Sequence, residues 1–94
     1  MVVVVPIRGA VLVIETADVP VLAFQAYAIP NVADIWNPRS APGSLWVDVT
    51  GAGATIGGCL EIPPGGAYRI SRKIAAEVTV TSATAGHAYY AVAY

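Results

Sequence analysis

Ionised side chains are scarce in this sequence. Only 12% of its 94 residues are Asp, Glu, Lys or Arg, whereas globular domains typically carry about 25%. Hydrophobic residues make up 56%, and the net charge at pH 7 is −1. A domain of this size buries only about two thirds of its surface on folding, so apolar surface must remain outside. Because large exposed apolar surfaces mark sites of association, the composition predicts a chain that works within an assembly.

Cysteine and basic residues are also rare. The single cysteine, Cys59, cannot form a disulfide within the chain, which excludes a scaffold held together by disulfides. We expect Cys59 to be buried like a small hydrophobic residue. The one basic cluster consists of Arg69, Arg72 and Lys73. Nucleic-acid binding needs a broader basic face or a known module. We therefore expect no nucleic-acid partner.

The sequence shows neither the pattern of a targeting segment nor that of a membrane-spanning helix. The start of the chain, residues 1–6, lacks the positive region and the small-residue cleavage site of a signal peptide. Pro6, Arg8, Glu15 and Asp18 interrupt the apolar runs far short of the ~20 residues that a membrane helix needs. We expect neither a signal peptide nor a membrane partner.

No motif for catalysis, metal binding or phosphate binding is present. His87 is the only histidine, no Gly-x-Ser-x-Gly elbow accompanies it, and we expect it at the start of a strand, half in water. Cys59 and His87 are too few for a metal site, and the six carboxylates fall in no acid–base motif. The glycine-rich stretch 51–58 lacks the Gly-Lys-Ser/Thr of a phosphate loop. We predict a loop there, and no enzyme, metal or cofactor.

Apolar residues show no helical periodicity in this sequence. Instead they occur in short runs rich in β-branched and aromatic residues, which favour strands. Gly, Pro, Asn and Ser bound these runs and predict strands at 2–5, 9–16, 21–28, 32–37, 44–50, 59–62, 67–71, 77–82 and 87–94. The sequence therefore predicts one all-β domain over residues 1–94, an antiparallel β-sandwich or jelly roll of about eight strands.

Residues alternate in 44–50, where Leu45, Val47 and Val49 share one face, and in 77–82, where we expect Val78 and Val80 to face inward and Thr79 and Thr81 outward.

Other segments carry further predictions. The unbroken apolar run 9–16 predicts a strand that is buried on both faces. Pro64 and Gly65 suit the second and third positions of a type II turn, after which we expect 67–71 to pair back on 59–62 as a hairpin.

Aromatic and bare apolar residues provide the candidate interface. Trp36 and Trp46 flank a Pro-rich loop. A core position and an interface position account equally well for each of these tryptophans. Tyr89 and Tyr90 are consecutive, so only one of them can face the core. Residues 2–5 are all β-branched and carry no charge. We expect this strand either to pair within the domain or to add to a sheet of a neighbouring subunit. The candidate interface residues are Val2, Val3, Val4, Val5, Trp36, Arg39, Trp46, Tyr90 and Tyr94.

From Asn37 onward the order of features resembles small bacteriophage virion proteins. The shared pattern is an Asn-Pro turn, the strand at 45–50, a Gly/Ala-rich loop, a Pro-Gly-Gly turn at 64–66 and a junction at 82–86. The resemblance implies a β-sandwich or jelly roll that serves as a capsid decoration, cement, head-fibre or tail component. It also implies location in the virion, trimers or higher oligomers, and contact with a major capsid or other virion protein.

Composition and resemblance lead to the same expectation. We expect a structural, non-enzymatic subunit whose apolar excess is buried against copies of itself or against a shell. The alternative is a small carbohydrate- or peptide-binding module that uses a surface carrying both Trp36 and Trp46.

Overall fold

The computed structural model describes residues 10–25, 29, 31–71, 73 and 76–93. These residues form eight strands and no helix. The strands are β1 (Ala10–Ile14), β2 (Val21–Phe24), β3 (Val32–Trp36), β4 (Leu45–Asp48), β5 (Leu60–Ile62), β6 (Ala67–Ser71), β7 (Val78–Thr81) and β8 (His87–Ala93). The strand expected at residues 2–5 lies outside the described part of the chain.

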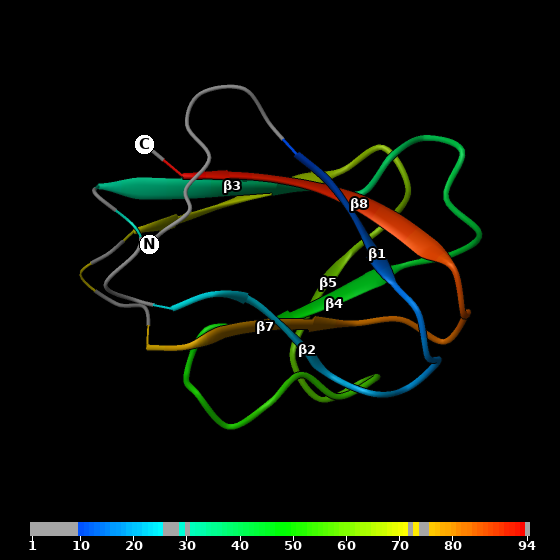
Figure 1. Cartoon of the computed structure of the whole chain (residues 1–94), viewed down its shortest axis with the longest axis horizontal. Helices are drawn as coiled ribbons and strands as arrows, with labels where there is room; N and C mark the ends of the chain where they lie inside the picture. Colours follow the sequence, from blue (N-terminus) through cyan, green and yellow to red (C-terminus); the bar gives the residue numbers. More distant parts are fainter. Residues whose placement is uncertain (1–9, 26–28, 30, 72, 74–75, 94) are drawn as a thin grey trace.

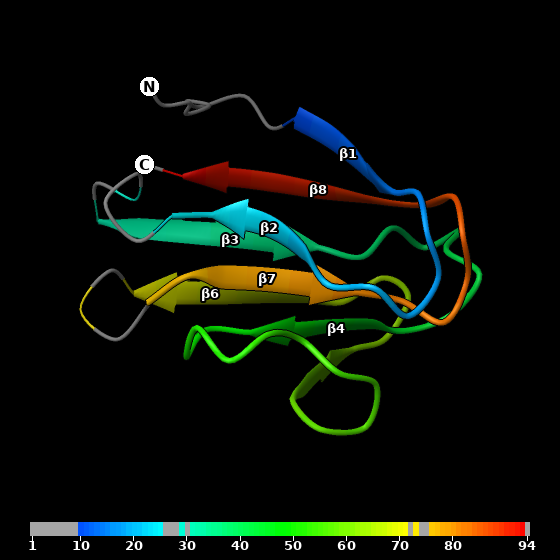
Figure 2. The same cartoon turned by 60° about the horizontal axis from the view of Figure 1, so that its bottom comes forward.

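The strands form two four-stranded antiparallel sheets that share one core (Figures 1 and 2). The β1 sheet has the order β1-β8-β3-β6, and the β2 sheet has the order β2-β7-β4-β5. β1 pairs with β8, β2 with β7, β3 with β6 and β4 with β5. This is the pairing of one long hairpin, closed between β4 and β5 and then rolled up. It defines a jelly roll, and it confirms the fold class predicted from the sequence.

Alternate residues of each strand build the core between the sheets. In β4, Leu45 and Val47 are buried while Trp46 is only partly so, and in β7 Val78 and Val80 are fully buried. Because successive side chains of a strand point to opposite faces, Trp46 lies on the outer face of the β2 sheet. The alternation predicted for both segments is confirmed.

Thr81, the last residue of β7, departs from simple alternation. It lies in register with Trp46 on the outer face of the β2 sheet, yet it is fully buried. Its Oγ1 has no hydrogen-bond partner among the described residues. A buried hydroxyl without a partner costs about 1–3 kcal/mol in proteins.

Replacing Thr81 with valine should therefore raise the free energy of unfolding by about 1 kcal/mol, because valine keeps the shape and removes the unpaired hydroxyl. Guanidinium denaturation measures this change. Thr79→Val is the matched control: the Thr79 Oγ1 accepts a hydrogen bond of 2.8 Å from the N–H of Ala54, so this variant should lose stability. A Thr81→Val protein less stable than the wild type would contradict the prediction.

The turn between β5 and β6 confirms one prediction and corrects another. Gly65 has φ 86°, and the N–H of Gly66 donates to the carbonyl of Pro63 at 2.9 Å, as a type II turn requires. However, β6 pairs with β3 rather than with β5, so the expected hairpin is wrong. The turn is held against the end of β3 by hydrogen bonds between Asn37 and Gly65–Gly66, and it leads the chain from one sheet to the other.

β1 is an end strand of its sheet, which the apolar run 9–16 did not lead us to expect. Leu12 is 37% and Val13 is 49% exposed, although Ile14 is fully buried. Successive side chains point to opposite faces, so both faces of this strand are partly open. The prediction of burial on both faces is wrong for the chain by itself, because within the described residues β1 has a neighbour only in β8.

Candidate functional site

An exposed aromatic pair lies on the outer face of the β1 sheet. Trp36 of β3 stands directly opposite Tyr90 of β8. Their neighbours Ile35 and Ala91 face the core, and the aromatic side chains are 38% and 40% exposed. Directly opposed residues have Cβ atoms about 4.5–5.5 Å apart, so the two residues are neighbours on this face. Tyr89 is buried, which confirms that only one of the two consecutive tyrosines enters the core.

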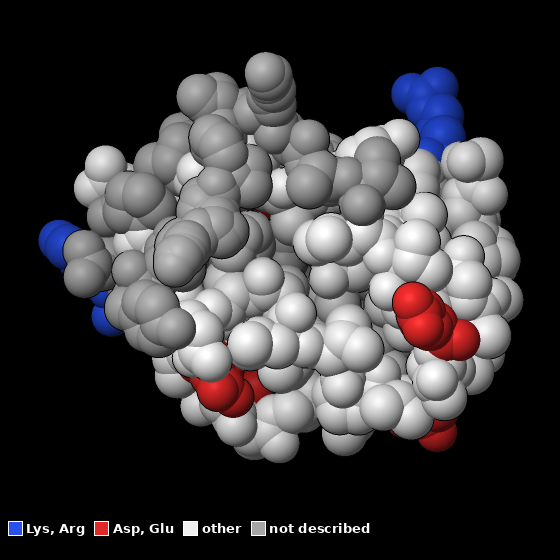
Figure 3. All heavy atoms as spheres, in the orientation of Figure 1, with Lys and Arg blue, Asp and Glu red and all other residues white. Residues whose placement is uncertain are grey.

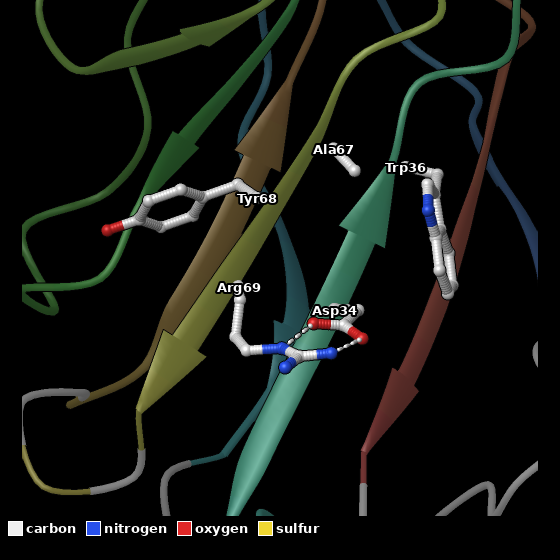
Figure 4. A pocket seen from close by; sticks show the side chains of 5 residues that line it. All are labelled: Asp34, Trp36, Ala67, Tyr68 and Arg69. Atoms are coloured by element: carbon white, nitrogen blue, oxygen red, sulfur yellow. Dashed lines mark hydrogen bonds and ion pairs between the residues drawn. The ribbon is translucent and has the colours of Figure 1, made fainter.

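A pocket of about 380 Å³ lies beside Trp36 on the side of β6 (Figure 4). Trp36 is in register with Ala67, and Asp34 is in register with Arg69. The short side chain of Ala67 leaves the hollow open between larger neighbours. Tyr68, the fifth lining residue, lies in register with the core residue Ile35, and its ring points away from the other four in Figure 4.

The polar side of this pocket is a two-point ion pair. The Nε of Arg69 donates to Oδ1 of Asp34 at 2.8 Å, and its Nη2 donates to Oδ2 at 3.0 Å. Asp34 is buried, whereas the side chain of Arg69 is largely exposed. Two parallel hydrogen bonds fix the orientation of both groups. The pocket therefore has an indole ring on one side and an ion pair on the other.

A second exposed surface lies along β1, an end strand of its sheet. Leu12 and Val13 carry it, and we call these two residues the β1 edge. Val19 and Leu22 are also exposed, but the register with Thr79 places Leu22 on the outer face of the β2 sheet, on the opposite side of the sandwich from Val13. Over the whole face in Figure 3, the described side chains are mostly uncharged, with acidic groups at separate places and basic groups at the rim.

The residues of the β1 edge are not among the candidates predicted from the sequence. The unbroken apolar run 9–16 was its only signal, and this pattern is shared by strands buried inside a fold and by strands buried against a partner. Only the position of β1 at the end of a sheet distinguishes the two cases.

A buried polar network closes one end of the sandwich. Nε2 of His87 lies 2.7 Å from Oδ1 of Asn37, and Nδ1 lies 2.6 Å from Oγ of Ser82. Asn37 donates its Nδ2 hydrogens to the carbonyls of Gly43 and Ile62, both at 2.9 Å. Its Oδ1 is therefore the acceptor, so His87 Nε2 carries the proton and Nδ1 accepts from the Ser82 hydroxyl.

This network corrects the expectation for His87. The residue begins β8 as predicted, but it is fully buried rather than half in water. Burial lowers the pKa of His87 below its ordinary value of 6.5. Ser82 and Asn37 are also buried. A substrate cannot reach this serine and histidine, so the network holds loops together rather than forming a hydrolytic triad.

Asp48, at the end of β4, organises the glycine-rich loop that follows. Its Oδ2 accepts backbone N–H bonds from Thr50, Ala52 and Gly53 at 3.1–3.2 Å, and its carboxylate also accepts the Thr50 hydroxyl. Burial raises the pKa of Asp48, but these hydrogen bonds outweigh it and hold the pKa below 3.8. The carboxylate thus serves as the anchor of a loop.

The other candidate residues lie apart from one another. Trp46 is on the outer face of the β2 sheet and Trp36 on that of the β1 sheet, so the two tryptophans do not share a surface. Arg39 is exposed in the loop after β3, where its Cγ lies close to Gly65. Cys59 is partly exposed rather than buried as expected, and its Sγ donates to the carbonyl of Thr55. The candidates Val2, Val3, Val4, Val5 and Tyr94 lie outside the described residues.

Comparison of the sequence and the fold with protein-family models, characterised proteins and solved structures found no match. In the part of the chain that the structure describes, no three His, Cys, Asp or Glu side chains gather to hold a metal ion. The same residues include no helix long and apolar enough to cross a membrane. The two exposed surfaces of the sandwich are therefore the features that point to a function.

Proposed function

We propose that this chain is a structural, non-enzymatic virion component that associates with copies of itself through the β1 edge. It serves as a capsid decoration or cement subunit, or as a head-fibre or tail-associated subunit. One observation carries the proposal: an end strand made wholly of apolar residues exposes two successive side chains, Leu12 and Val13.

The energetics of an apolar end strand support self-association. Such a strand presents unpaired backbone groups and apolar side chains together, which makes it a template for pairing with another chain. Soluble monomers usually protect such edges with charges or prolines. β1 carries neither. Burying the exposed parts of Leu12 and Val13 would contribute about 1 kcal/mol each.

The virion role is supported by the fold and by the resemblance of the segment from Asn37 onward. Viral capsid domains are among the proteins built as jelly rolls, although this fold also carries other functions. Only 12% of residues are charged, a composition that suits a subunit shielded by neighbours. A shell or fibre supplies such neighbours in many copies.

Self-association is tested by replacing Val13 with lysine and measuring mass by sedimentation over a range of concentrations. The wild type should associate as concentration rises, and Val13→Lys should weaken association about tenfold or more, because a charge would enter an apolar contact. Ser40→Lys, an exposed residue in the loop after β3, adds the same charge elsewhere and should leave association unchanged. A wild type that stays monomeric at millimolar concentration would contradict the proposal.

The virion role has its own test. Imaging of native particles by electron cryomicroscopy, with mass spectrometry of their proteins, should find this chain in many copies at a repeating position. Particles that contain no copy of the chain would rule out the virion role while leaving self-association intact.

A further inference from the structure

The backbone of β1 has hydrogen-bonding groups that point away from its sheet. Within the described residues, β1 pairs only with β8. The carbonyl of Ile14 is turned toward the start of β8, where it accepts the N–H of Gly86 at 2.8 Å. Because the N–H and C=O groups of successive residues point to opposite sides of a strand, those of Val13 and Val11 point outward. These two residues can therefore hydrogen-bond to a further strand.

The hydrophobic core is also incompletely covered at this end of the sandwich. Leu12 lies in register with the buried Tyr89, so it is on the core-facing side of β1, yet it is 37% exposed. Val21 of β2 lies in register with the buried Val80 and is only partly buried. β1 and β2 are the uppermost strands of their sheets in Figure 2. A partner strand that brings an apolar side chain next to Leu12 would close the core here.

The sequence of β1 and the charge that follows it fit a second copy of the same strand. A two-fold axis perpendicular to the sheet brings residues of the same facing opposite each other in antiparallel strands. With the axis at Leu12, this residue meets its own copy, Val13 meets Val11, and all five residues of β1 pair within β1. With the axis at Val13, the carboxylate of Glu15 would come opposite Val11. The position of the charge therefore favours the axis at Leu12.

We propose that two copies of this chain pair β1 with β1, antiparallel and about a two-fold axis at Leu12. The two four-stranded β1 sheets then form one sheet of eight strands. On each side of the axis, Val13 of one copy exchanges N–H and C=O bonds with Val11 of the other, and the two Leu12 side chains meet between the cores. This inference rests on the proposed self-association through the β1 edge and specifies its geometry.

Cysteine cross-linking of the full chain tests this register, in a Cys59→Ser background that removes the native thiol. Under mild oxidation, Leu12→Cys should form a disulfide-linked dimer on a non-reducing gel, because opposed residues without mutual hydrogen bonds have Cα atoms about 4.5 Å apart. Val13→Cys should link about tenfold more slowly, since its two copies lie on a diagonal of about 7–8 Å. Leu22→Cys replaces a leucine that is 49% exposed on the other sheet and is the control for random collision.

Hydrogen exchange of the wild type, followed by nuclear magnetic resonance, tests the strand pairing without any substitution. Exchange is measured at concentrations below and above the onset of association. The N–H of Val13 should exchange about tenfold more slowly in the associated chain, because a partner strand covers it. The N–H of Leu12 points toward β8 in either state and should change little, so it serves as the internal control. This measurement decides the question if a cysteine variant does not fold.

The outcomes separate this inference from the proposed function. Faster linking of Val13→Cys than of Leu12→Cys would overturn the register. A chain that associates while the N–H of Val13 gains no protection would overturn the pairing of β1 with β1 and leave self-association intact. A wild type that remains monomeric at millimolar concentration would overturn both proposals.

Discussion

Replacing Asn37 with alanine should lower the free energy of unfolding by about 3–5 kcal/mol. Asn37 is buried, and its side chain joins three partners: the carbonyls of Gly43 and Ile62 and the Nε2 of His87. Truncation leaves these groups without their partner in the interior. Each such group costs about 1–3 kcal/mol, which far exceeds the effect of an ordinary surface substitution.

Denaturation by guanidinium or heat measures this loss. Ser44→Ala is the matched control, because Ser44 also makes a side-chain hydrogen bond, to Glu61, but in an exposed position. It should change the free energy of unfolding by less than about 0.5 kcal/mol. Similar losses in the two variants would show that the buried network contributes no more than a surface contact.

Lowering the pH below 6.5 should destabilise the fold through His87, and this is the second large effect. The ring must stay neutral in the folded chain, because Nε2 donates to Asn37 while Nδ1 accepts from Ser82. Burial lowers the pKa of His87 in the folded state. The unfolded chain therefore binds more protons in this range, and stability falls with pH by up to about 1.4 kcal/mol per unit.

The sign of this dependence follows from the lowered pKa. The stabilising contribution of neutral His87 is fully present above 6.5, the ordinary pKa, and is lost as pH falls from there toward the lower pKa of the folded state. His87 is the only histidine, and carboxylates in unfolded chains titrate near pH 4. Terminal amino groups and cysteines of unfolded chains titrate mainly above pH 7, so the window between pH 7 and 5.5 isolates this residue.

His87→Gln is the control for the titration, since glutamine can donate and accept but does not ionise in this range. Denaturation at several pH values should give a slope for the wild type that is absent in His87→Gln. Equal slopes in the two proteins would contradict the assignment of a buried neutral histidine.

Local patterns in the sequence determined the kind of structure that forms. Alternation around Leu45 and Val47 predicted which face of β4 enters the core, and the consecutive pair Tyr89 and Tyr90 required one ring to point out. Pro64 and Gly65 specified a type II turn from their φ preferences alone. These features depend on residues within a few positions of one another, which is why sequence reasoning captured them and the two-sheet fold class.

Partners that are distant in the sequence were decided only by the tertiary structure. A type II turn is compatible with a hairpin or with a crossing between sheets, and the packing of β6 on β3 selects the crossing. Likewise, Trp36 meets Tyr90 across 54 positions only because β8 inserts between β1 and β3. The sequence by itself determined where strands form, the alternation within β4 and β7 and the type II turn, since these are set by local sterics and period. The pairing order placed Trp36 beside a pocket, buried His87 and left β1 at an edge, because it depends on how the two sheets fill a common core.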